Sequence, residues 1–542
     1  MTFKKYSTAI FAALLAALVL AVFWQTTGFE LINLDDLNYT VLHSVVKEGL
    51  TFSGIKEVFT SIQFSGYMPV TLLSYMADVE FFGLKPSGFH FTNTFLHLLN
   101  TLLLFAFLYR ATGSGLKSFF AAALWAIHPL RAESVAWVAE RKDVLAGFFF
   151  LAGLLSYCEY AKSKRPVFYV AALVAMLLGL LSKSILVVFP LVLLILDFWP
   201  LERFKQEGGK TKKLLIEKIP FLALSALFSV LSFINQKESI YSLQHGSVFS
   251  RIPDIPTSYL HYLKETLWPV GLFMEDRHTT NYLSGVWALG AGLLIIALTF
   301  LVWRFRKTIP AVTAGWFWYL VILFPVSGVV PLDFYLVADH FTYLPHIGLM
   351  VAAVWGTERL YSHFLQNAKP LAIAGGVIAI VLAVLCFQQV SLWRDELTLF
   401  SYVDKMSGGK NAHANKTLAF HCYNDALAHY NEGKYGEAYD ELSRTLLLDP
   451  YAPKANGHKG IVAANLGRYG EAAELLRKEL EMAPGDRDFS TRLANILILG
   501  GDLPGAARQG LENIRRWPDD KVAWQAINYL GGEEKARMLA GR

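Results

Sequence analysis

The sequence predicts an all-α protein in which a polytopic membrane helical bundle is followed by a C-terminal solenoid of paired helices. Three observations support this fold class. The 542 residues are 54% hydrophobic and only 17% charged, with a mean hydropathy of +0.38, whereas soluble proteins carry roughly 25% charged residues. Long apolar runs recur from the N-terminus to residue 390, and a sequence repeat follows them.

The apolar runs predict about eleven transmembrane helices, because a bilayer crossing needs about 20 apolar residues. They lie near residues 7–24, 92–109, 118–130, 144–161, 166–182, 184–200, 218–235, 282–303, 309–331, 341–358 and 370–390. The first run follows Lys4 and Lys5, and no small-residue cleavage site comes after it. We therefore interpret it as an uncleaved first span rather than as a signal peptide.

Basic residues occupy every second loop between these runs. They are Lys4, Lys5, Arg110, Lys117, Lys162, Lys164, Arg165, Arg203, Lys205, Lys210, Lys212, Lys213, Arg304, Arg306, Lys307, Arg359 and Lys369. The positive-inside rule places these loops in the cytoplasm. The alternate loops then share the outer side of the membrane, and an odd number of spans places the C-terminal region there as well.

A repeat with a period of 34 residues begins beyond Trp393. GKYGEA at 433–438 returns as GRYGEA at 467–472 and, more weakly, as GDLPGA at 501–506. Three prolines keep the same spacing: Pro450, Pro484 and Pro518. This period is typical of the tetratricopeptide repeat, in which each unit is a pair of antiparallel helices.

We therefore predict a membrane domain over residues 1–395 and a tetratricopeptide-repeat domain over residues 396–542. The repeats are expected at about 419–452, 453–486 and 487–520. Two roles stay open for them. They could form a scaffold that packs on the membrane domain, or a concave groove that binds a protein or peptide.

Composition argues against two other classes of protein. The net charge of +5 is modest and is spread over short loops, so there is no basic footprint for nucleic acid. Cys158, Cys386 and Cys422 are too few and too scattered for a disulfide framework or a cysteine zinc site.

The adjacent carboxylates of Asp35 and Asp36 follow the first apolar run. Acidic residues are costly at the edge of a bilayer unless they bind something or move a proton. One interpretation is a helix-capping or turn pair. The other is a general base, or a metal-binding carboxylate, that faces a site at the membrane surface.

The stretch HPLRAESVAWVAERKD at 128–143 is the most charged part of the membrane half. Its charged residues are Arg131, Glu133, Glu140, Arg141, Lys142 and Asp143. They could lie in an interfacial loop whose arginines reach the headgroups. A charge at the middle of a span costs roughly 2.5–3.5 kcal/mol, so they need either the surface or an anionic ligand. Arginine suits phosphate because its planar fork donates two parallel hydrogen bonds.

Two further polar stretches of sequence fall in the loops that we assign to the outer side of the membrane. Lys183 lies in LSKS at 181–184, and the stretch ADHFTYLP at 338–345 contributes Asp339, His340 and Tyr343. Taken alone, these are turn or packing residues; beside a phosphate site, Lys183 would add positive charge. We see no metal-ligand spacing here, and the two aspartates and scattered histidines are the candidate ligands if a divalent metal is needed.

Together these features resemble the GT-C superfamily of polyprenyl-phosphate-dependent glycosyltransferases. More narrowly, they resemble the transmembrane and tetratricopeptide-repeat (TMTC) O-mannosyltransferase-like proteins. The motifs that carry the resemblance are DD at 35–36, GYMPVTLLSY at 66–75, GFHFTNTFLHLLN at 88–100, HPLRAESVAWVAERKDVL at 128–145, LSKS at 181–184 and ADHFTYLP at 338–345. They span nearly the whole membrane half, and the repeats cover the rest.

The resemblance implies inverting transfer of a sugar from a polyprenyl-phosphate donor to a protein or glycan acceptor outside the cytoplasm. It implies that Asp35 is the general base and that Asp36 orients the acceptor or its partner. It maps the donor phosphate to Arg141 and also to Arg131, Lys183 and His340. The other outer-face candidates are Glu133, Lys142, Asp143, Asp339 and Tyr343. No cofactor beyond the lipid-linked donor is implied, and a divalent metal is not indicated.

Two positions depart from the family pattern. Ser184 stands where a glutamate is common, and His340 stands where an arginine is common; an unperturbed histidine is mostly uncharged at neutral pH. The short repeat array suggests a bacterial inner-membrane protein with its repeats on the extracytoplasmic side. Two alternatives remain: a non-enzymatic membrane anchor for a repeat scaffold in envelope assembly, and a ligase or polymerase of lipid-linked oligosaccharides.

Overall fold

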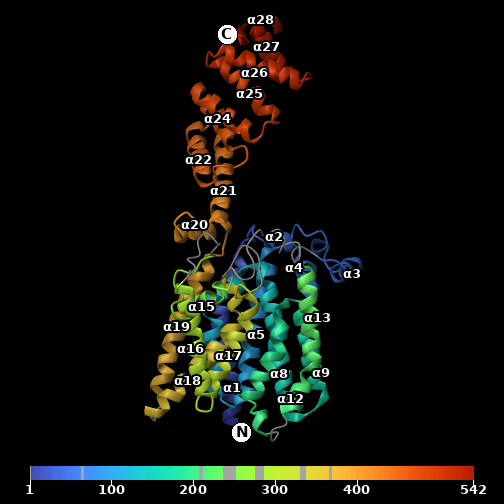
Figure 1. Cartoon of the computed structure of the whole chain (residues 1–542), viewed down its shortest axis with the longest axis vertical. Coiled ribbons are helices and arrows are strands. Elements are labelled where there is room, and N and C mark those ends of the chain that lie inside the picture. The colour runs from blue at the N-terminus through green and yellow to red at the C-terminus, as the bar shows by residue number, and fades with distance from the viewer. Residues whose placement is uncertain are drawn as a thin grey trace. The chain divides into compact units, whose positions relative to one another are not determined.

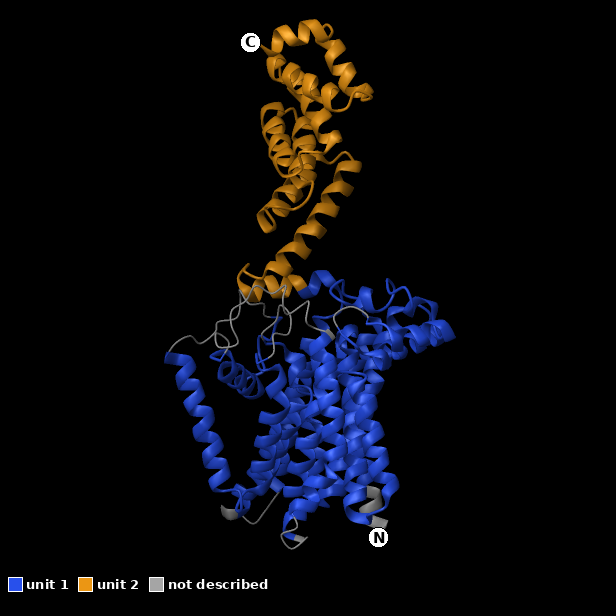
Figure 2. Ribbon diagram, turned by 45° about the vertical axis from the view of Figure 1, so that its right-hand side comes forward, with its two compact units in different colours: residues 1–399 blue, residues 400–542 orange. Residues whose placement is uncertain are grey.

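The computed structural model describes residues 2–62, 66–206, 211–235, 252–274, 286–329, 337–364 and 369–541. Within these ranges the secondary structure is helical, and no β-strand longer than a single bridge residue occurs. The predicted all-α fold class is confirmed. The chain divides into two compact units, residues 1–399 and 400–542 (Figure 2). The boundary lies inside helix α20 (Glu396–Ser407).

The first unit contains the apolar helices. Five described segments are long and apolar enough to cross a membrane: Ser7–Gly28, Pro86–Thr112, Val138–Ser163, Val286–Arg304 and Lys369–Ser391. They include helices α1 (Thr2–Phe23), α5 (Pro86–Thr112), α8 (Arg141–Ser163), α16 (Val286–Arg304) and α19 (Lys369–Ser391). A sixth is available if α12 (Thr211–Glu217) and the following helix α13 (Ile219–Asn235), bent by 45°, form one span.

The remaining predicted runs form shorter or more polar helices. Four are apolar but short: Gly115–Ala126, Pro166–Leu180, Ser184–Phe198 and Pro310–Val326. The run at 341–358 falls in α18 (Pro345–Phe364), where Glu358 and Arg359 interrupt the apolar sequence. The protein is therefore an integral membrane protein with several apolar helices, and the number eleven stays a prediction.

Two glycines lie at a close crossing of helices in this unit. α17 (Pro310–Leu323) packs along α18 at Gly315 and Gly348. A Cβ atom added to Gly315 would lie 2.2 Å from the Gly348 carbonyl oxygen, and one added to Gly348 would lie 2.4 Å from the Gly315 carbonyl oxygen. Small residues at such contacts let helix backbones approach in a membrane. No side chain fits at either position without separating the helices.

Short helices gather at the end of the first unit opposite the N-terminus. Figure 1 shows α2 (Asp36–Tyr39), α3 (Phe52–Thr60) and α4 (Pro69–Phe82) at this end. The adjoining segments are 3₁₀ helix η3 (Pro129–Arg131), α7 (Ala132–Ala136), η4 (Val138–Glu140), η5 (Ser184–Val188) and η8 (Asp339–Thr342). Residues 127–141 are all buried. This burial is inconsistent with an interfacial loop whose arginines reach into the headgroups.

The second unit contains three helix pairs at the predicted period. They are α21 (Ala412–Asn431) with α22 (Tyr435–Leu448), α23 (Ala455–Asn465) with α24 (Tyr469–Met482), and α25 (Arg487–Leu499) with α26 (Leu503–Arg516). α27 (Lys521–Tyr529) and α28 (Glu533–Ala540) follow. Gly433, Gly467 and Gly501 turn the chain between paired helices with φ of 77°, 75° and 80°. The repeated glycine is thus explained, because this backbone conformation favours glycine.

Replacing Gly315 by alanine should destabilise the first unit. The new methyl group would overlap a backbone oxygen, and overpacking of this kind typically costs about 1–3 kcal/mol. Thermal unfolding of the detergent-solubilised protein would show a lower Tm. Gly376→Ala in α19 is the matched control, because a Cβ atom there meets nothing within 4 Å. A Tm for Gly315→Ala equal to that of the control would contradict the close crossing.

Candidate functional site

Four polar segments that are far apart in the sequence meet in the first unit. The backbone N–H of Ala139 donates to Asp36 at 2.7 Å and joins the first segment to the second. Lys183 pairs with Glu140 at 3.3 Å and brings in the third. His340 contacts Glu133 at 2.8 Å and brings in the fourth. The structure therefore assembles a polar site from residues 35–36, 131–143, 183 and 339–343.

Asp36 fastens the first segment to the second. Its side chain is fully buried, and its two oxygens accept from the backbone N–H groups of Ile32 at 3.0 Å and Ala139 at 2.7 Å. Burial raises the pKa of Asp36 to about 7, although the two hydrogen bonds oppose this shift. Asp36 thus holds the loop that carries Asp35.

Asp35 occupies the position before α2 but its side chain makes no capping hydrogen bond. It is partly exposed, unlike Asp36. Its charge lies close enough to Asp36 to contribute to the raised pKa of that carboxyl. Of the two carboxylates, Asp35 is therefore the more exposed.

Six charged or titratable side chains form an ion cluster beside this pair: Glu133, Glu140, Lys142, Asp143, Lys183 and His340. Glu140 lies at its centre, 2.9 Å from the Lys142 ammonium and 3.3 Å from that of Lys183. Lys183 also pairs with Asp143. The Lys142 ammonium lies 5.6 Å from the Tyr39 ring of α2, so the cluster adjoins the acidic pair.

His340 lies between two carboxylates. Its Nδ1 atom is 2.8 Å from Glu133, and its Nε2 atom is 3.7 Å from Glu140. Burial alone would lower the pKa of His340, but the charges of Glu140 and Glu133 outweigh it and raise the pKa above its ordinary value. The sequence-based expectation of a mostly uncharged histidine applied to an unperturbed side chain. It did not include Glu133 and Glu140, which the sequence does not show to be neighbours of His340.

Arg141 lies outside the ion cluster. Its guanidinium is fully buried, pairs with Asp78 at 2.7 Å and donates to the Phe89 carbonyl oxygen at 2.7 Å and to the Asn93 side chain. It also stacks at 4.9 Å from the Tyr75 ring. Sequence reasoning missed Asp78, whose signal is one of two acids, with Glu80, in the otherwise apolar helix α4. Arg141 therefore connects α4, α5 and α8 from within.

Arg131 is buried beside aromatic rings. It donates to the Thr342 hydroxyl and lies 5.2 Å from the Tyr343 ring and 5.8 Å from the Trp125 ring. Among the described residues, its Nε and Nη1 atoms have no hydrogen-bond partner. Burial lowers the pKa of Arg131 to about 10, so the side chain stays charged at neutral pH.

Tyr343 and Asp339 lie next to Arg131 but have structural contacts. The Tyr343 hydroxyl is 2.8 Å from His97 and 2.9 Å from the Asn100 amide nitrogen. The Asp339 backbone oxygen accepts from Thr342 at 2.6 Å. Tyr343 is thus part of the packing between α5 and α18 rather than of the ion cluster.

The group that could hold a metal ion includes one of the expected histidines but neither of the two expected aspartates. One ligand atom each from Glu140, Asp143 and His340 lies within 4.8 Å of the others, and all three residues are buried. Asp35 and Asp36 are not members of this group. Spacing along the chain could not reveal this three-residue group, because Glu140 and Asp143 come from one segment and His340 comes from another.

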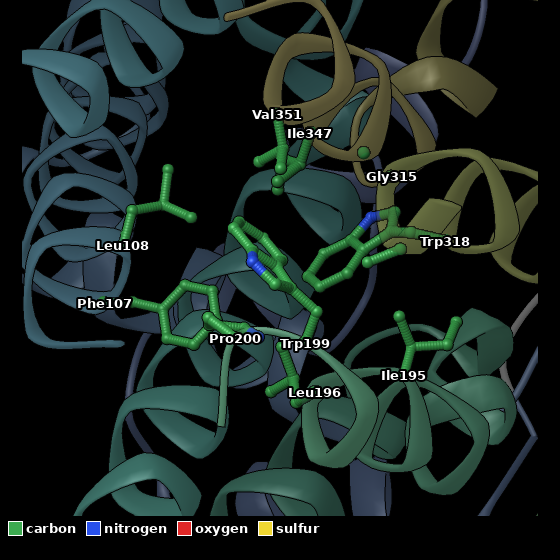
Figure 3. Close-up of a pocket in the computed structure, with 12 residues that line it drawn as sticks. Phe107, Leu108, Ile195, Leu196, Trp199, Pro200, Gly315, Trp318, Ile347 and Val351 are labelled. Carbon is green, nitrogen blue, oxygen red and sulfur yellow. The ribbon is translucent and has the colours of Figure 1, made fainter. Parts of the chain in front are cut away.

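An apolar pocket lies apart from these charges. It is formed by α5, α10 (Phe189–Phe198), α17 and α18, and its walls include Phe107, Trp199 and Trp318 (Figure 3). No titratable side chain lines it. It therefore offers packing contacts to an apolar group but no acid–base chemistry.

Comparisons with known proteins bear on both units. The tetratricopeptide-repeat family model matches residues 423–487 and 462–521. Protein O-mannosyl-transferase Tmtc3 of Drosophila melanogaster is 26% identical over 494 residues, which cover 75% of this chain and 51% of that protein. Protein O-mannosyl-transferase F38B6.6 of Caenorhabditis elegans is 23% identical over 391 residues, covering 70% and 52%. These relatives confirm the resemblance to the TMTC family.

The chain spans about half the length of these two relatives. Human protein O-mannosyl-transferase TMTC2 is 35% identical over a shorter stretch of 98 residues, 18% of this chain and 12% of that protein. Among solved structures, ArnT from Cupriavidus metallidurans bound to undecaprenyl phosphate aligns with 86% of this chain and 79% of its own, at 15% identity and a TM-score of 0.38.

Removing Arg141 should destabilise the protein strongly. Arg141→Ala leaves the buried Asp78 carboxylate with the Thr92 hydroxyl but without its cationic partner, and loss of one member of a buried ion pair typically costs about 3–5 kcal/mol. Arg110→Ala is the control, because Arg110 pairs with Glu159 in an exposed position and such pairs contribute about 0–1 kcal/mol. The double variant Arg141→Ala/Asp78→Ala should recover part of the loss in unfolding experiments. A fully stable Arg141→Ala protein would contradict the internal role.

Asp36 should make stability depend on pH. Its pKa is raised from 3.8 to about 7 on folding, so its contribution is greatest below pH 3.8 and is lost as the pH rises through 7. Asp36→Asn has no such titration. The Tm of the wild type relative to that of Asp36→Asn should therefore fall between pH 4 and pH 8. A difference that stays constant over this range would contradict the raised pKa.

Proposed function

Starting from this resemblance to the TMTC O-mannosyltransferase-like proteins, we propose that the chain is a GT-C-type glycosyltransferase of the membrane. It moves a sugar from a polyprenyl-phosphate-linked donor to a protein or glycan acceptor. One observation carries the proposal. Asp35 is a partly exposed carboxylate held beside a buried cluster of lysines and acids that four separate segments assemble. This transfer requires a base that accepts the proton of the acceptor hydroxyl and positive charge that stabilises the leaving phosphate.

Asp35 acts as the general base. It accepts the proton of the acceptor hydroxyl while the acceptor oxygen bonds to the anomeric carbon of the sugar. The bond from that carbon to the lipid phosphate breaks, and the phosphate leaves with the electron pair. Attack from the side opposite the phosphate inverts the anomeric carbon. Asp36 positions Asp35 through its two backbone hydrogen bonds.

The donor phosphate is held by Lys183, Lys142 and Arg131 rather than by Arg141. The donors of Arg141 are engaged by Asp78, Phe89 and Asn93. In contrast, two nitrogen atoms of Arg131 have no partner among the described residues, and the side chain of Lys183 is 17% exposed. Positive charge at this position stabilises the leaving phosphate as negative charge develops on it.

The proposed cellular setting rests on the loop charges, which indicate sidedness, and on the short repeat array, which suggests a bacterial protein. The protein lies in a bacterial inner membrane with the ion cluster and the repeat unit on the extracytoplasmic side. The repeat unit presents the acceptor, because tetratricopeptide repeats form concave binding surfaces. Membrane lipids surround the first unit, and nucleic acid is not a partner.

Asp35→Asn should abolish transfer without affecting insertion or folding. Loss of a general base typically lowers the rate about 10²–10⁴-fold. A deletion strain would be complemented with wild type or variant, and its envelope proteins and glycans would be compared by mass spectrometry. The wild type should restore a hexose or pentose on a defined target, and Asp35→Asn should not.

Glu48→Gln is the matched control, because Glu48 is an exposed carboxylate that follows Asp35 by thirteen residues. It should restore the sugar fully. Restoration by Asp35→Asn to the same level would exclude Asp35 as the base. A deletion of residues 396–542 that abolishes function, together with full activity of Asp35→Asn, would instead support the scaffold alternative.

A further inference from the structure

Two carboxylates and one imidazole converge beside the proposed phosphate site. Glu140 and Asp143 are three residues apart at the start of α8, so their side chains share one face of the chain. His340 enters from η8. One ligand atom from each residue lies within 4.8 Å of the others. Oxygen and imidazole donors in this combination bind divalent transition metals.

The orientation of His340 is that of a metal ligand. Glu133 lies 2.8 Å from its Nδ1 atom and directs its Nε2 atom toward Glu140. A carboxylate behind a histidine is the usual support of a metal-ligating imidazole. The separation of 3.7 Å between Nε2 and the Glu140 oxygen is too long for a hydrogen bond. It is close to the roughly 3.4 Å that separates two ligands bonded at about 2.1 Å to one tetrahedral ion.

Asp143 provides a second, independent indication. Only 6% of the residue is exposed, and among the described residues its Oδ2 atom has no hydrogen-bond partner. A buried carboxylate oxygen without a partner is costly. A cation bound between Asp143 and Glu140 would satisfy it.

The charges of the cluster leave room for a cation. Glu133, Glu140 and Asp143 supply three negative charges, and Lys142 and Lys183 supply two positive ones. A histidine bound to a metal ion is neutral, and with His340 in that form one negative charge of the cluster is unbalanced. A divalent ion that takes the place of the Lys183 ammonium would make the cluster neutral.

We propose that Glu140, Asp143 and the Nε2 atom of His340 bind one Zn²⁺ or Mn²⁺ ion, with Glu133 as the outer carboxylate that orients His340. Three protein ligands leave a coordination position open to water or to a phosphate oxygen. Two ammonium groups compete with the ion: that of Lys183 contacts both carboxylates, and that of Lys142 contacts Glu140 alone.

Metal binding can be measured without any transfer activity, so the test is independent of the proposed function. The full chain, purified in detergent without a polyhistidine tag, would be stripped with chelator and titrated with Zn²⁺ and with Mn²⁺. We expect one ion per chain by elemental analysis. Co²⁺ would serve as a spectroscopic probe, and its visible absorption should change on binding and disappear when Zn²⁺ is added.

Variants separate the site from adventitious binding. His340→Ala should lose the ion, and Glu133→Gln should weaken binding roughly 10–100-fold. His261→Ala is the matched control and should bind normally, because His261 also contacts a carboxylate, Glu265 at 2.9 Å, but is not part of the group. Lys183→Met should bind more tightly than the wild type, since one competing ammonium is removed.

Three results would overturn the proposal. They are wild-type protein that binds neither Zn²⁺ nor Mn²⁺ stoichiometrically, His340→Ala protein that keeps the ion, and an ion bound only after Lys183→Met. The last would show that Lys183 is the resident cation. The Co²⁺ spectrum of the wild type needs no variant, so a variant that fails to fold leaves the test intact.

Discussion

Charges withdrawn from water must be paired, and this constraint governs the end of the first unit where the polar segments meet. Residues 127–141 are buried throughout, yet they carry acids and arginines. Arg141 is neutralised by Asp78 from α4, and Glu140 by lysines on both sides. Because an unpaired buried charge costs several kcal/mol, each pairing fixes the segment that supplies its partner. The positions of α4, of the stretch around Lys183 and of η8 all depend on these pairs.

The same constraint distinguishes charged side chains that are fully engaged inside the protein from those that are not. Arg141 and Asp78 satisfy each other and leave little for a ligand, whereas Arg131 keeps unpartnered nitrogen atoms among the described residues. Asp36 is engaged by two backbone N–H groups, and Asp35 beside it stays partly exposed. In each pair of like residues, the first member is buried and held by partners inside the protein, whereas the second keeps exposed surface (Asp35) or nitrogen atoms without a partner among the described residues (Arg131). This division supports the proposed roles of Asp35 and Arg131.

Local patterns in the sequence were sufficient for the fold class and the repeats. Apolar runs indicate membrane helices, and a glycine that returns every 34 residues marks the turn between paired helices at Gly433, Gly467 and Gly501. Pairings across long separations could not be predicted in this way. Glu133 and His340 are 207 residues apart, and Arg141 and Asp78 are 63 apart. The sequence therefore indicated the charged residues of the site, but neither the pairing of Arg141 with Asp78 nor the group formed by Glu140, Asp143 and His340.

Use of a lipid-phosphate-linked sugar as donor is the step on which the proposed function depends. It can be measured with the purified protein in liposomes, supplied with polyprenyl-phosphate sugars labelled in the sugar and with envelope extract from a deletion strain. We expect label to move from one of these lipids to an acceptor while an equal amount of free polyprenyl phosphate appears. Label that stays in the lipid for every hexose and pentose donor, although the protein is folded, would contradict it.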